Sequence, residues 1–355
     1  MVSNMGSIAE AKVREFSIND PITWNAVVRS FPDYDVFYLS GYSKAFMEES
    51  QKNGVPILLL YENGDDRAIN VVLRRDIADD EKLHGKLEKG KYFDLITPYG
   101  YGGFWGNVSD WDKLNRAYAA YCTENGYVCE FVRFELFTDY HQHYPGEVET
   151  RTHNVVRSLD LPLDEMWMDF KQKVRKNVKR ANTYQLEILI EPTDAHLEDF
   201  LRIYFETMDR TNAASEYYFS ERFFRDLNDM KDNIMYFHVV YGGKIISTEL
   251  VLYGAETAYS YLGGTDRAYF EVRPNDFLKY EIIKWAKAKG LKNFVLGGGY
   301  GADDGIFQYK LCLAPRGQYD FYIGRRVFDE AAYGELVGLR AGDTLNEEFF
   351  PVYRS

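Results

Sequence analysis

The chain is poor in the features that define several common protein classes. It has only 3 cysteines, Cys122, Cys129 and Cys312. Their odd number and the lack of CxxC spacing argue against a disulfide framework or a cysteine-based zinc site. The longest aliphatic run, residues 55–60, is far too short to span a bilayer. Since the N-terminus also lacks the charged-then-apolar order of a signal peptide, we expect a cytoplasmic protein with reduced thiols and no membrane insertion.

Standard catalytic and metal-binding signatures are also missing from the sequence. There is no GxxxxGK[ST] phosphate loop, no GxSxG elbow and no HExxH motif. His141 and His143 form an HxH, but it lies in an expected loop without further ligands nearby. His238 falls inside a predicted strand, where a satisfied sheet residue is commoner than a base. The sequence therefore predicts no metal site.

The composition indicates a globular protein with a large core. The 355 residues are 46% hydrophobic, which suits two or more domains or one large domain. The net charge of −13 argues against broad nucleic-acid binding, and DNA is not an expected partner. It leaves room for one local basic site.

One short segment runs against this acidic background. Residues 171–180 (KQKVRKNVKR) carry six cationic side chains and no acidic one. Like charges stand at i,i+4 spacing in three pairs, each of which destabilises a helix by roughly 0.2–0.5 kcal/mol. A phosphate-bearing ligand would offset this cost. A solvated helix face, balanced by acids elsewhere in the fold, is the other interpretation.

The chain repeats an order of strand, strand, strand, helix and strand. We therefore predict an α/β (α+β) protein of two tandem domains, 1–155 and 156–355, each a mixed β-sheet flanked by helices, with a cleft between them. The expected strands are 57–61, 68–75, 92–97 and 128–136 in the first half, and 234–241, 244–252, 258–262 and 293–296 in the second, with helices at 111–125 and 276–289.

Glycine clusters follow three of these expected strands, at 98–103, 263–264 and 297–301. Glycine permits tight turns and also close approach of a ligand to the backbone. The third cluster leads to Lys310, which we expect on an aromatic-flanked strand near a charged ligand. Arg210, near the end of a helix, is suited to clamp a carboxylate or a phosphate, although a pair with Asp209 or Glu206 would use it equally well.

Several of these segments together resemble a known family. The chain is similar to the FemAB-like branch of the GNAT superfamily, which includes peptidoglycan bridge-forming aminoacyltransferases and related acetyltransferases. The resemblance implies tandem GNAT-like domains with a cleft between them. It is carried by 173–181 (KVRKNVKRA), 206–211 (ETMDRT), 274–299 (PNDFLKYEIIKWAKAKGLKNFVLGGG) and 305–310 (GIFQYK), with 94–103 (DLITPYGYGG) similar to the first domain of relatives labelled N-acetyltransferases.

The resemblance implies a lysine, Lys310, near the reacting centre and an arginine, Arg210, that contacts the acceptor. Asp303 is a candidate base by position, and substrate-assisted proton transfer is equally open. The full candidate site comprises Lys310, Tyr309 and Asp303 as catalytic residues, Arg210, Tyr218, Tyr99, Gly298 and Gly299 for the substrate, and Lys171, Arg175, Lys176, Lys179 and Arg180 for donor phosphates.

The chain departs from the family pattern at two places. Tyr309-Lys310 replaces the common Phe-Lys pair, and Leu311-Cys312-Leu313 replaces a glycine. No Q/R-x-x-G-x-G/A coenzyme A loop precedes Asn275, which weakens an ordinary acetyl-CoA interpretation.

The resemblance implies an N-acyltransferase that moves an aminoacyl or acyl group to an amine of a cell-wall precursor or related acceptor. The donor would be aminoacyl-tRNA or acyl-CoA, with no tightly bound cofactor. Two alternatives stay open: an acyl-CoA-dependent GNAT N-acetyltransferase that acts on a small amine or sugar, and a non-catalytic protein that binds a cell-wall precursor. The oligomeric state is left undetermined.

Overall fold

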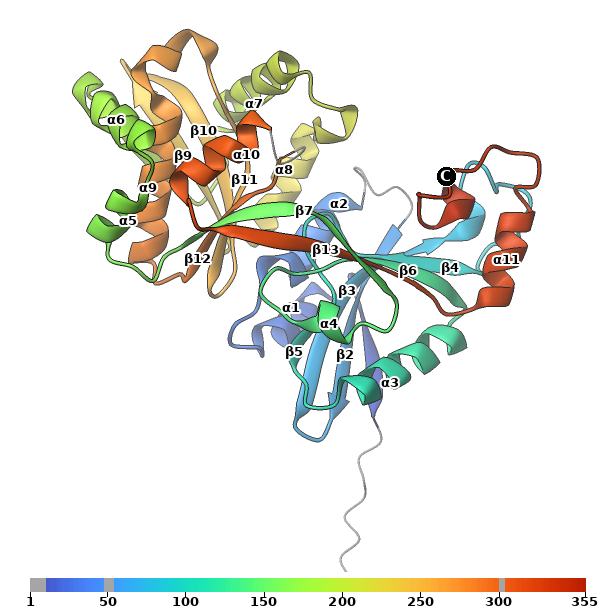
Figure 1. Cartoon of the computed structure of the whole chain (residues 1–355). Coiled ribbons are helices and arrows are strands. Elements are labelled where there is room, and N and C mark those ends of the chain that lie inside the picture. The colour runs from blue at the N-terminus through green and yellow to red at the C-terminus, as the bar shows by residue number, and fades with distance from the viewer. Residues whose placement is uncertain (1–10, 48–53, 300–303) are drawn as a thin grey trace, which may run out of the picture. The chain divides into compact units, whose positions relative to one another are not determined.

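The computed structural model describes residues 11–47, 54–299 and 304–355. By its internal contacts the chain divides into two compact units, each built from separate stretches of sequence (Figure 1). Unit 1 comprises Met1–Phe31, Phe46–Thr150 and Tyr322–Ser355, and unit 2 comprises Pro32–Ala45 and Arg151–Phe321. These units are not the linear halves expected from the sequence, and the boundary between residues 155 and 156 stays a prediction.

Unit 1 is a mixed sheet in the order β1-β2-β3-β4-β6, and Ile323–Val327 of β13 pair with β6 at its end. All neighbours are antiparallel except β4 and β6, which are parallel and are connected through α3. The strands are β1 (Lys12–Ser17), β2 (Gly54–Asn63), β3 (Asp66–Asp76), β4 (Phe93–Ile96), β5 (Trp105–Asn107, paired with β3), β6 (Tyr127–Arg133) and β13 (Gln318–Val327), and the helices are α1 (Pro21–Arg29), α3 (Trp111–Glu124), α4 (Tyr140–His143) and α11 (Glu330–Gly338).

Unit 2 is a mixed sheet in the order β7-β12-β11-β10-β9-β8. Strands β11 and β12 are parallel and are connected through α9, whereas the other pairs are antiparallel. The strands are β7 (Glu147–Ser158), β8 (Glu187–Glu191), β9 (Ile234–Tyr241), β10 (Lys244–Tyr253), β11 (Thr257–Thr265) and β12 (Asn293–Gly297), and the helices are α2 (Ser40–Phe46), α5 (Leu163–Asp169), α6 (Gln172–Ala181), α7 (Leu197–Thr211), α8 (Glu221–Leu227), α9 (Pro274–Ala288) and α10 (Gly305–Leu313).

The predicted repeat is confirmed in the topology. The series β2-β3-β4-α3-β6 and β9-β10-β11-α9-β12 both contain two antiparallel pairings followed by a parallel strand–helix–strand unit. The fold is thus α/β, with two sheets that share this order of strands and helix. In the described part of the chain, no helix combines the length and apolar character needed to cross a membrane.

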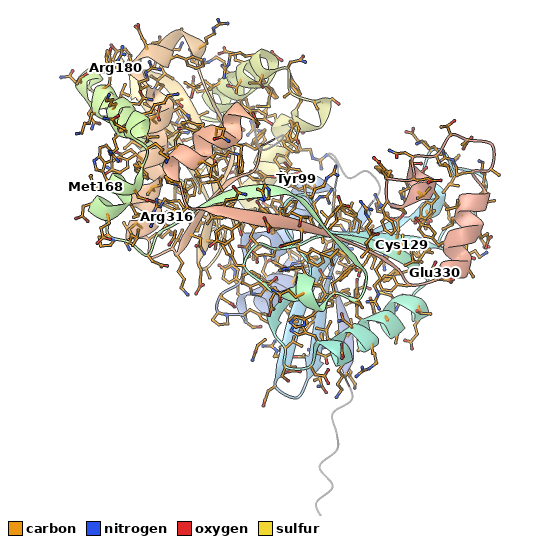
Figure 2. The ribbon with its side chains drawn as sticks, in the orientation of Figure 1. Tyr99, Cys129, Met168, Arg180, Arg316 and Glu330 are labelled. Atoms are coloured by element: carbon orange, nitrogen blue, oxygen red, sulfur yellow. The ribbon has the colours of Figure 1, made fainter. Side chains whose placement is uncertain are left out.

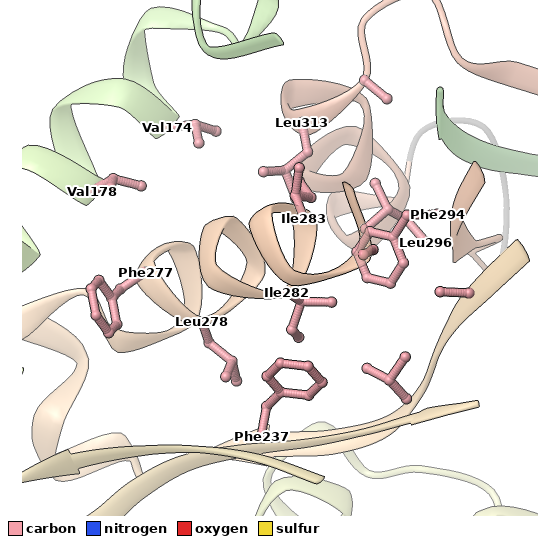
Figure 3. Packing of buried hydrophobic residues seen from close by; sticks show 14 of the residues in the cluster. Val174, Val178, Phe237, Phe277, Leu278, Ile282, Ile283, Phe294, Leu296 and Leu313 are labelled. Carbon is pink, nitrogen blue, oxygen red and sulfur yellow. The ribbon is translucent and has the colours of Figure 1, made fainter. Parts of the chain in front are cut away.

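Helix α9 of unit 2 packs an apolar stripe of its side chains against the sheet. Leu278 and Ile282 of α9 point at Phe237 on β9, and Ile283 lies on another side of the helix, near Leu313 of α10 (Figure 3). All five are buried in one cluster. Burial of this stripe provides most of the helix stability, because isolated helices of this length are marginal in water.

Two local expectations were wrong. Residues 307–310 lie on helix α10 rather than on a strand. Asp304 caps this helix by accepting a hydrogen bond from the Ile306 backbone at 3.0 Å, which satisfies an otherwise unpaired N–H at the start of the helix. The HxH, expected in a loop, forms the end of the short helix α4, Tyr140–His143.

Candidate active site

Unit 2 contains a pocket of about 480 Å³. Its walls come from α7, β10, β11, the start of α9 and the start of α10. The lining residues are Thr207, Arg210, Thr211, Thr248, Glu249, Ser260, Tyr261, Leu262, Gly263, Gly264, Thr265, Phe270, Arg273, Pro274, Asn275, Asp276, Lys279, Gly305, Ile306, Tyr309 and Lys310.

The part of β11 that lines the pocket is the part that no longer pairs with its parallel neighbour β12. Within the described residues, β11 pairs with β12 only through Thr257–Tyr259 and Asn293–Val295. Beyond this point β11 continues to Thr265 along the pocket and pairs with β10 on its other edge. Backbone groups on a strand edge of this kind can hydrogen-bond an extended, amide-containing ligand.

The glycines on β11 have a packing role of their own. A Cβ on Gly263 would lie 2.4 Å from Thr248 O, and a Cβ on Gly264 would lie 2.3 Å from Thr207 Oγ1. Because both distances are far below van der Waals contact, the two glycines let β10 and α7 approach β11. Close backbone packing therefore explains this cluster without a ligand.

Lys310 lines the pocket from helix α10. Its Nζ donates a hydrogen bond to Gly298 O at 2.5 Å. Burial lowers the pKa of Lys310 to about 8, and the positive charge of Lys279 acts in the same direction. The ammonium is thus the major form at pH 7, and it loses its proton about one pH unit higher. Of the third glycine cluster, Gly298 accepts the hydrogen bond of Lys310, and a Cβ on Gly297 would lie only 3.3 Å from Lys310 Nζ.

A buried ion pair beside Lys310 was not anticipated from the sequence. Lys279 Nζ lies 2.6 Å from Glu249 Oε2 and donates to Ser260 Oγ at 2.5 Å. The side chains of Lys279 and Glu249 are only 10% and 5% exposed. Glu249 Oε1 is buried and has no hydrogen-bond partner in the described part of the chain. In the sequence, the only sign of this pair is that Lys279 and Glu249 are charged residues within an apolar helix and an apolar strand. That they pair with each other depends on the tertiary fold.

A second carboxylate lies at the start of α9. Burial raises the pKa of Asp276 to about 6. Asn177 of α6 donates to its Oδ2 at 3.0 Å, while Oδ1 is buried without a hydrogen-bond partner among the described residues. The charge of Lys173 lowers the Asp276 pKa against the effect of burial. Through Asn177 and Lys173, the basic helix reaches the pocket wall.

The predicted donor-binding cations lie on another part of that helix. Val174 and Val178 of α6 are buried in the core. Arg175 donates to Met168 O at 2.7 Å and also to Phe170 O, so its guanidinium holds the preceding turn. Figure 2 labels Arg180 at the outer side of α6. Among the residues described here, the pocket lining contains none of Lys171, Arg175, Lys176, Lys179 and Arg180.

Of the predicted substrate residues, Arg210 lines the pocket. Its Nη1 donates to Thr265 O at 3.0 Å and its guanidinium carbon lies 5.0 Å from the Phe270 ring centre. Tyr218 is partly exposed, donates to Asp209 Oδ1 at 2.9 Å, and is absent from the described pocket lining.

The remaining predicted residues do not all line the pocket. Tyr309 lines the pocket, and burial raises the pKa of its hydroxyl well above the usual value. Tyr99 belongs to unit 1, where its ring lies 5.9 Å from Phe46. Asp303 lies outside the described residues. The pocket thus brings together Lys310, Tyr309 and Arg210.

A family model described as an acetyltransferase (GNAT) domain matches residues 168–311. This part of the chain is therefore similar to a GNAT domain. Every residue of the pocket lies inside it, from Thr207 to Lys310. A comparison with curated protein sequences found no match.

Solved structures share the fold over most of the chain. A structure of FemX matches with a TM-score of 0.70 at 13% identity, covering 91% of this chain and 99% of that one. L-PGS from Bacillus licheniformis matches with a TM-score of 0.54 at 13% identity, covering 90% and 96%. A conserved protein of unknown function from Bacteroides thetaiotaomicron VPI-5482 matches with a TM-score of 0.57 at 12% identity, covering 88% and 98%. The resemblance to FemAB-like proteins is thus confirmed in the fold.

Proposed function

We propose that the protein is an N-acyltransferase that transfers an aminoacyl or acyl group to an amine of a cell-wall precursor or a related acceptor. The observation that carries this proposal is the buried Lys310 ammonium in a pocket that β11 also lines, beyond the point where described residues of β12 pair with it, in the region that matches the GNAT family model. The acceptor class rests on the resemblance to FemAB-type enzymes.

Lys310 is suited to stabilise the oxyanion that develops when an amine attacks a carbonyl. A fixed cation in a desolvated pocket interacts more strongly with a developing negative charge than the same cation in water. Its hydrogen bond to Gly298 O and its place on α10 orient the ammonium before the substrate arrives.

The attacking amine must lose protons during the reaction. Glu249 and Asp276 are the carboxylates of the pocket whose buried oxygens lack a partner within the described residues. Since the Asp276 pKa is about 6, this group is mostly ionised at pH 7 and is able to accept a proton. Asp303 stays a candidate on the basis of the sequence.

The donor is either aminoacyl-tRNA or acyl-CoA, and each has a feature in its favour. The exposed cations of α6 favour the phosphates of a tRNA acceptor end. The β11 edge and the start of α9 favour an acyl-CoA, whose amide-containing arm would hydrogen-bond the strand while its phosphates meet the helix N-terminus. Acyl-CoA-dependent transfer to a small amine or sugar is therefore the second candidate function.

Product mass analysis tests the proposal directly. Aminoacyl-tRNA and acyl-CoA are each offered with amine acceptors, with and without RNase. Transfer that RNase abolishes identifies the tRNA donor, and transfer from acyl-CoA that survives RNase identifies the coenzyme. Binding of a cell-wall precursor without transfer from either donor would instead favour the non-catalytic alternative.

Replacement of Lys310 tests its role in the same assay. We expect Lys310→Ala to lower turnover by about 10²–10³-fold, the usual effect of removing one oxyanion donor. Lys284→Ala is the matched control, since Lys284 lies on the surface of α9 and pairs with Glu281 at 2.7 Å. Unchanged turnover of the Lys310 variant would remove this residue from the mechanism.

A further inference from the structure

Three potential metal ligands converge at one end of the unit 2 sheet. Glu191 ends the edge strand β8, His196 is the N-cap residue of α7, and His238 lies in the middle of β9. One ligand atom from each lies within 4.8 Å of the others. None of the three is among the described residues that line the pocket around Lys310. The cluster is therefore a separate feature of the region that matches the GNAT family model.

The distances fit the ligand shell of one small cation. His196 Nδ1 lies 2.9 Å from Glu191 Oε1 and 3.1 Å from Oε2, and His238 Nε2 lies 3.4 Å from Oε1. A tetrahedral zinc ion with bonds of about 2.0–2.1 Å holds neighbouring ligand atoms about 3.3 Å apart. Small side-chain movements would therefore place all three atoms around one ion.

His238 offers a buried ring nitrogen to this cluster. Its side chain is only 1% exposed, and Nε2 is buried with no hydrogen-bond partner among the described residues. The other ring nitrogen, Nδ1, lies 2.7 Å from Thr248 Oγ1. The ring can bind a cation in the tautomer in which Nδ1 donates to this hydroxyl, because Nε2 then presents a lone pair toward Glu191 Oε1, 3.4 Å away. The Thr248 hydroxyl beside the second ring nitrogen also fits a metal-binding histidine, because a partner at that position fixes the orientation and tautomer of the ring.

We propose that Glu191, His196 and His238 bind one divalent transition-metal ion, with zinc as the best match to a two-histidine, one-carboxylate ligand set. The His196 side chain is 41% exposed and Glu191 is 12% exposed, so an ion can enter from solvent and a water can complete the tetrahedron. The ion would tie the edge strand β8 to α7 and β9. This metal site would be separate from the acyl-transfer pocket. The sequence did not predict it.

Metal binding by the purified full chain tests this proposal without an activity assay. Protein freed of metal by a chelator is titrated with Zn²⁺ by calorimetry and with Co²⁺ by visible absorption. We expect one equivalent to bind, Co²⁺ to give the intense absorption of a tetrahedral site, and Zn²⁺ to raise the thermal midpoint.

Exposed His196 supplies the test variant, because its replacement leaves the core intact. His196→Ala and Glu191→Gln should each lower Zn²⁺ affinity at least tenfold and remove the Zn²⁺-dependent rise in the thermal midpoint. His143→Ala is the control, since His143 is 39% exposed and has a carboxylate partner, Asp139, at 3.5 Å. A chain that binds no stoichiometric metal, or a His196→Ala variant that binds like the control, would show a hydrogen-bonded cluster only and overturn the proposal.

Discussion

At the scale of single residues, the pocket is defined by charges that are held out of water. Lys310, Lys279, Glu249 and Asp276 all lie in it, and the pKa values of Lys310 and Asp276 are shifted toward the neutral form. Desolvation is the first cause of both shifts, because a low-dielectric environment disfavours a charge. Residues perturbed in this way concentrate at functional sites.

The pH dependence of turnover should report the state of Lys310. If its ammonium stabilises the oxyanion, kcat falls as the pH rises through about 8, because the amine loses its charge there. Lys310→Arg should remove this decline, since a guanidinium keeps its charge across the range. Stopped assays between pH 6 and 10 provide the profile. A rate that instead increases through pH 8 would indicate that Lys310 acts as a base.

Removal of Lys279 should affect stability and titration together. Lys279→Met leaves Glu249 buried without its partner, which we expect to cost about 3–5 kcal/mol in urea unfolding. It also removes a positive charge that lowers the Lys310 pKa, so the alkaline decline should move to higher pH. The double variant Lys279→Met/Glu249→Leu is the control and should recover most of the stability. Purely additive losses would contradict a coupled pair.

The sequence pointed to Lys310 and Arg210 but not to their neighbours. Both stand in short motifs that can be read locally. Glu249 and Lys279 are 30 positions apart in the chain, and they meet only because α9 packs across β10 and β11. Such a contact depends on how the helix packs on the sheet, which the local sequence does not show.

At the scale of elements, the strongly patterned segments were predicted well. The hairpin of β9 and β10 and the helix α9 lie within a few residues of their expected positions. Alternating and helical spacing of apolar residues, together with glycines at the turns and helix ends, provided this information. Helix α10 was missed because its nine residues are too evenly apolar to show a helical stripe.

The basic helix α6 divides its cations between two roles. The charge of Lys173 acts on Asp276, to which Asn177 donates a hydrogen bond, whereas Arg175 binds backbone carbonyls of the preceding turn. The remaining four cations, Lys171, Lys176, Lys179 and Arg180, are exposed. Donor binding by this surface stays a prediction.

A salt titration of tRNA binding tests the four exposed cations. Their replacement by glutamine should weaken tRNA binding and reduce the slope of log affinity against log salt by several units, because each phosphate contact releases counterions. The control carries glutamine at four cations outside α6, which makes the same change in net charge: Lys89, Lys91, Lys289 and Lys292. Equal effects of both sets would contradict a specific donor site on α6.

At the scale of the whole molecule, segments far apart in the chain complete each unit. Asp94 on β4 is buried and lies 2.6 Å from both Arg75 Nε and Arg354 Nε. The Tyr353 hydroxyl also donates to it, at 2.9 Å. These contacts hold the Asp94 pKa below its usual value despite burial. The last residues of the chain are thus part of the core of unit 1.

Loss of Arg354 should therefore destabilise the protein strongly. We expect Arg354→Ala to cost about 3 kcal/mol, the lower end for breaking a buried ion pair, because Arg75 continues to partner Asp94. Arg316→Ala is the control, since Arg316 is 78% exposed and its pair with Asp169 should contribute less than about 1 kcal/mol. Urea unfolding measures both, and equal losses would argue against a structural role for this buried cluster.

The sequence by itself determined the α/β class, the repeated order of elements and the FemAB-like segments. These features depend on local periodicity, turn residues and short motifs, which act over a few positions. The tertiary structure decided which charges share the pocket, that Lys310 lies on a helix, and that Glu191, His196 and His238 meet. It also decided that residues 322–355 complete unit 1. Burial and pairing between distant segments produce these arrangements, and no local pattern in the chain encodes them.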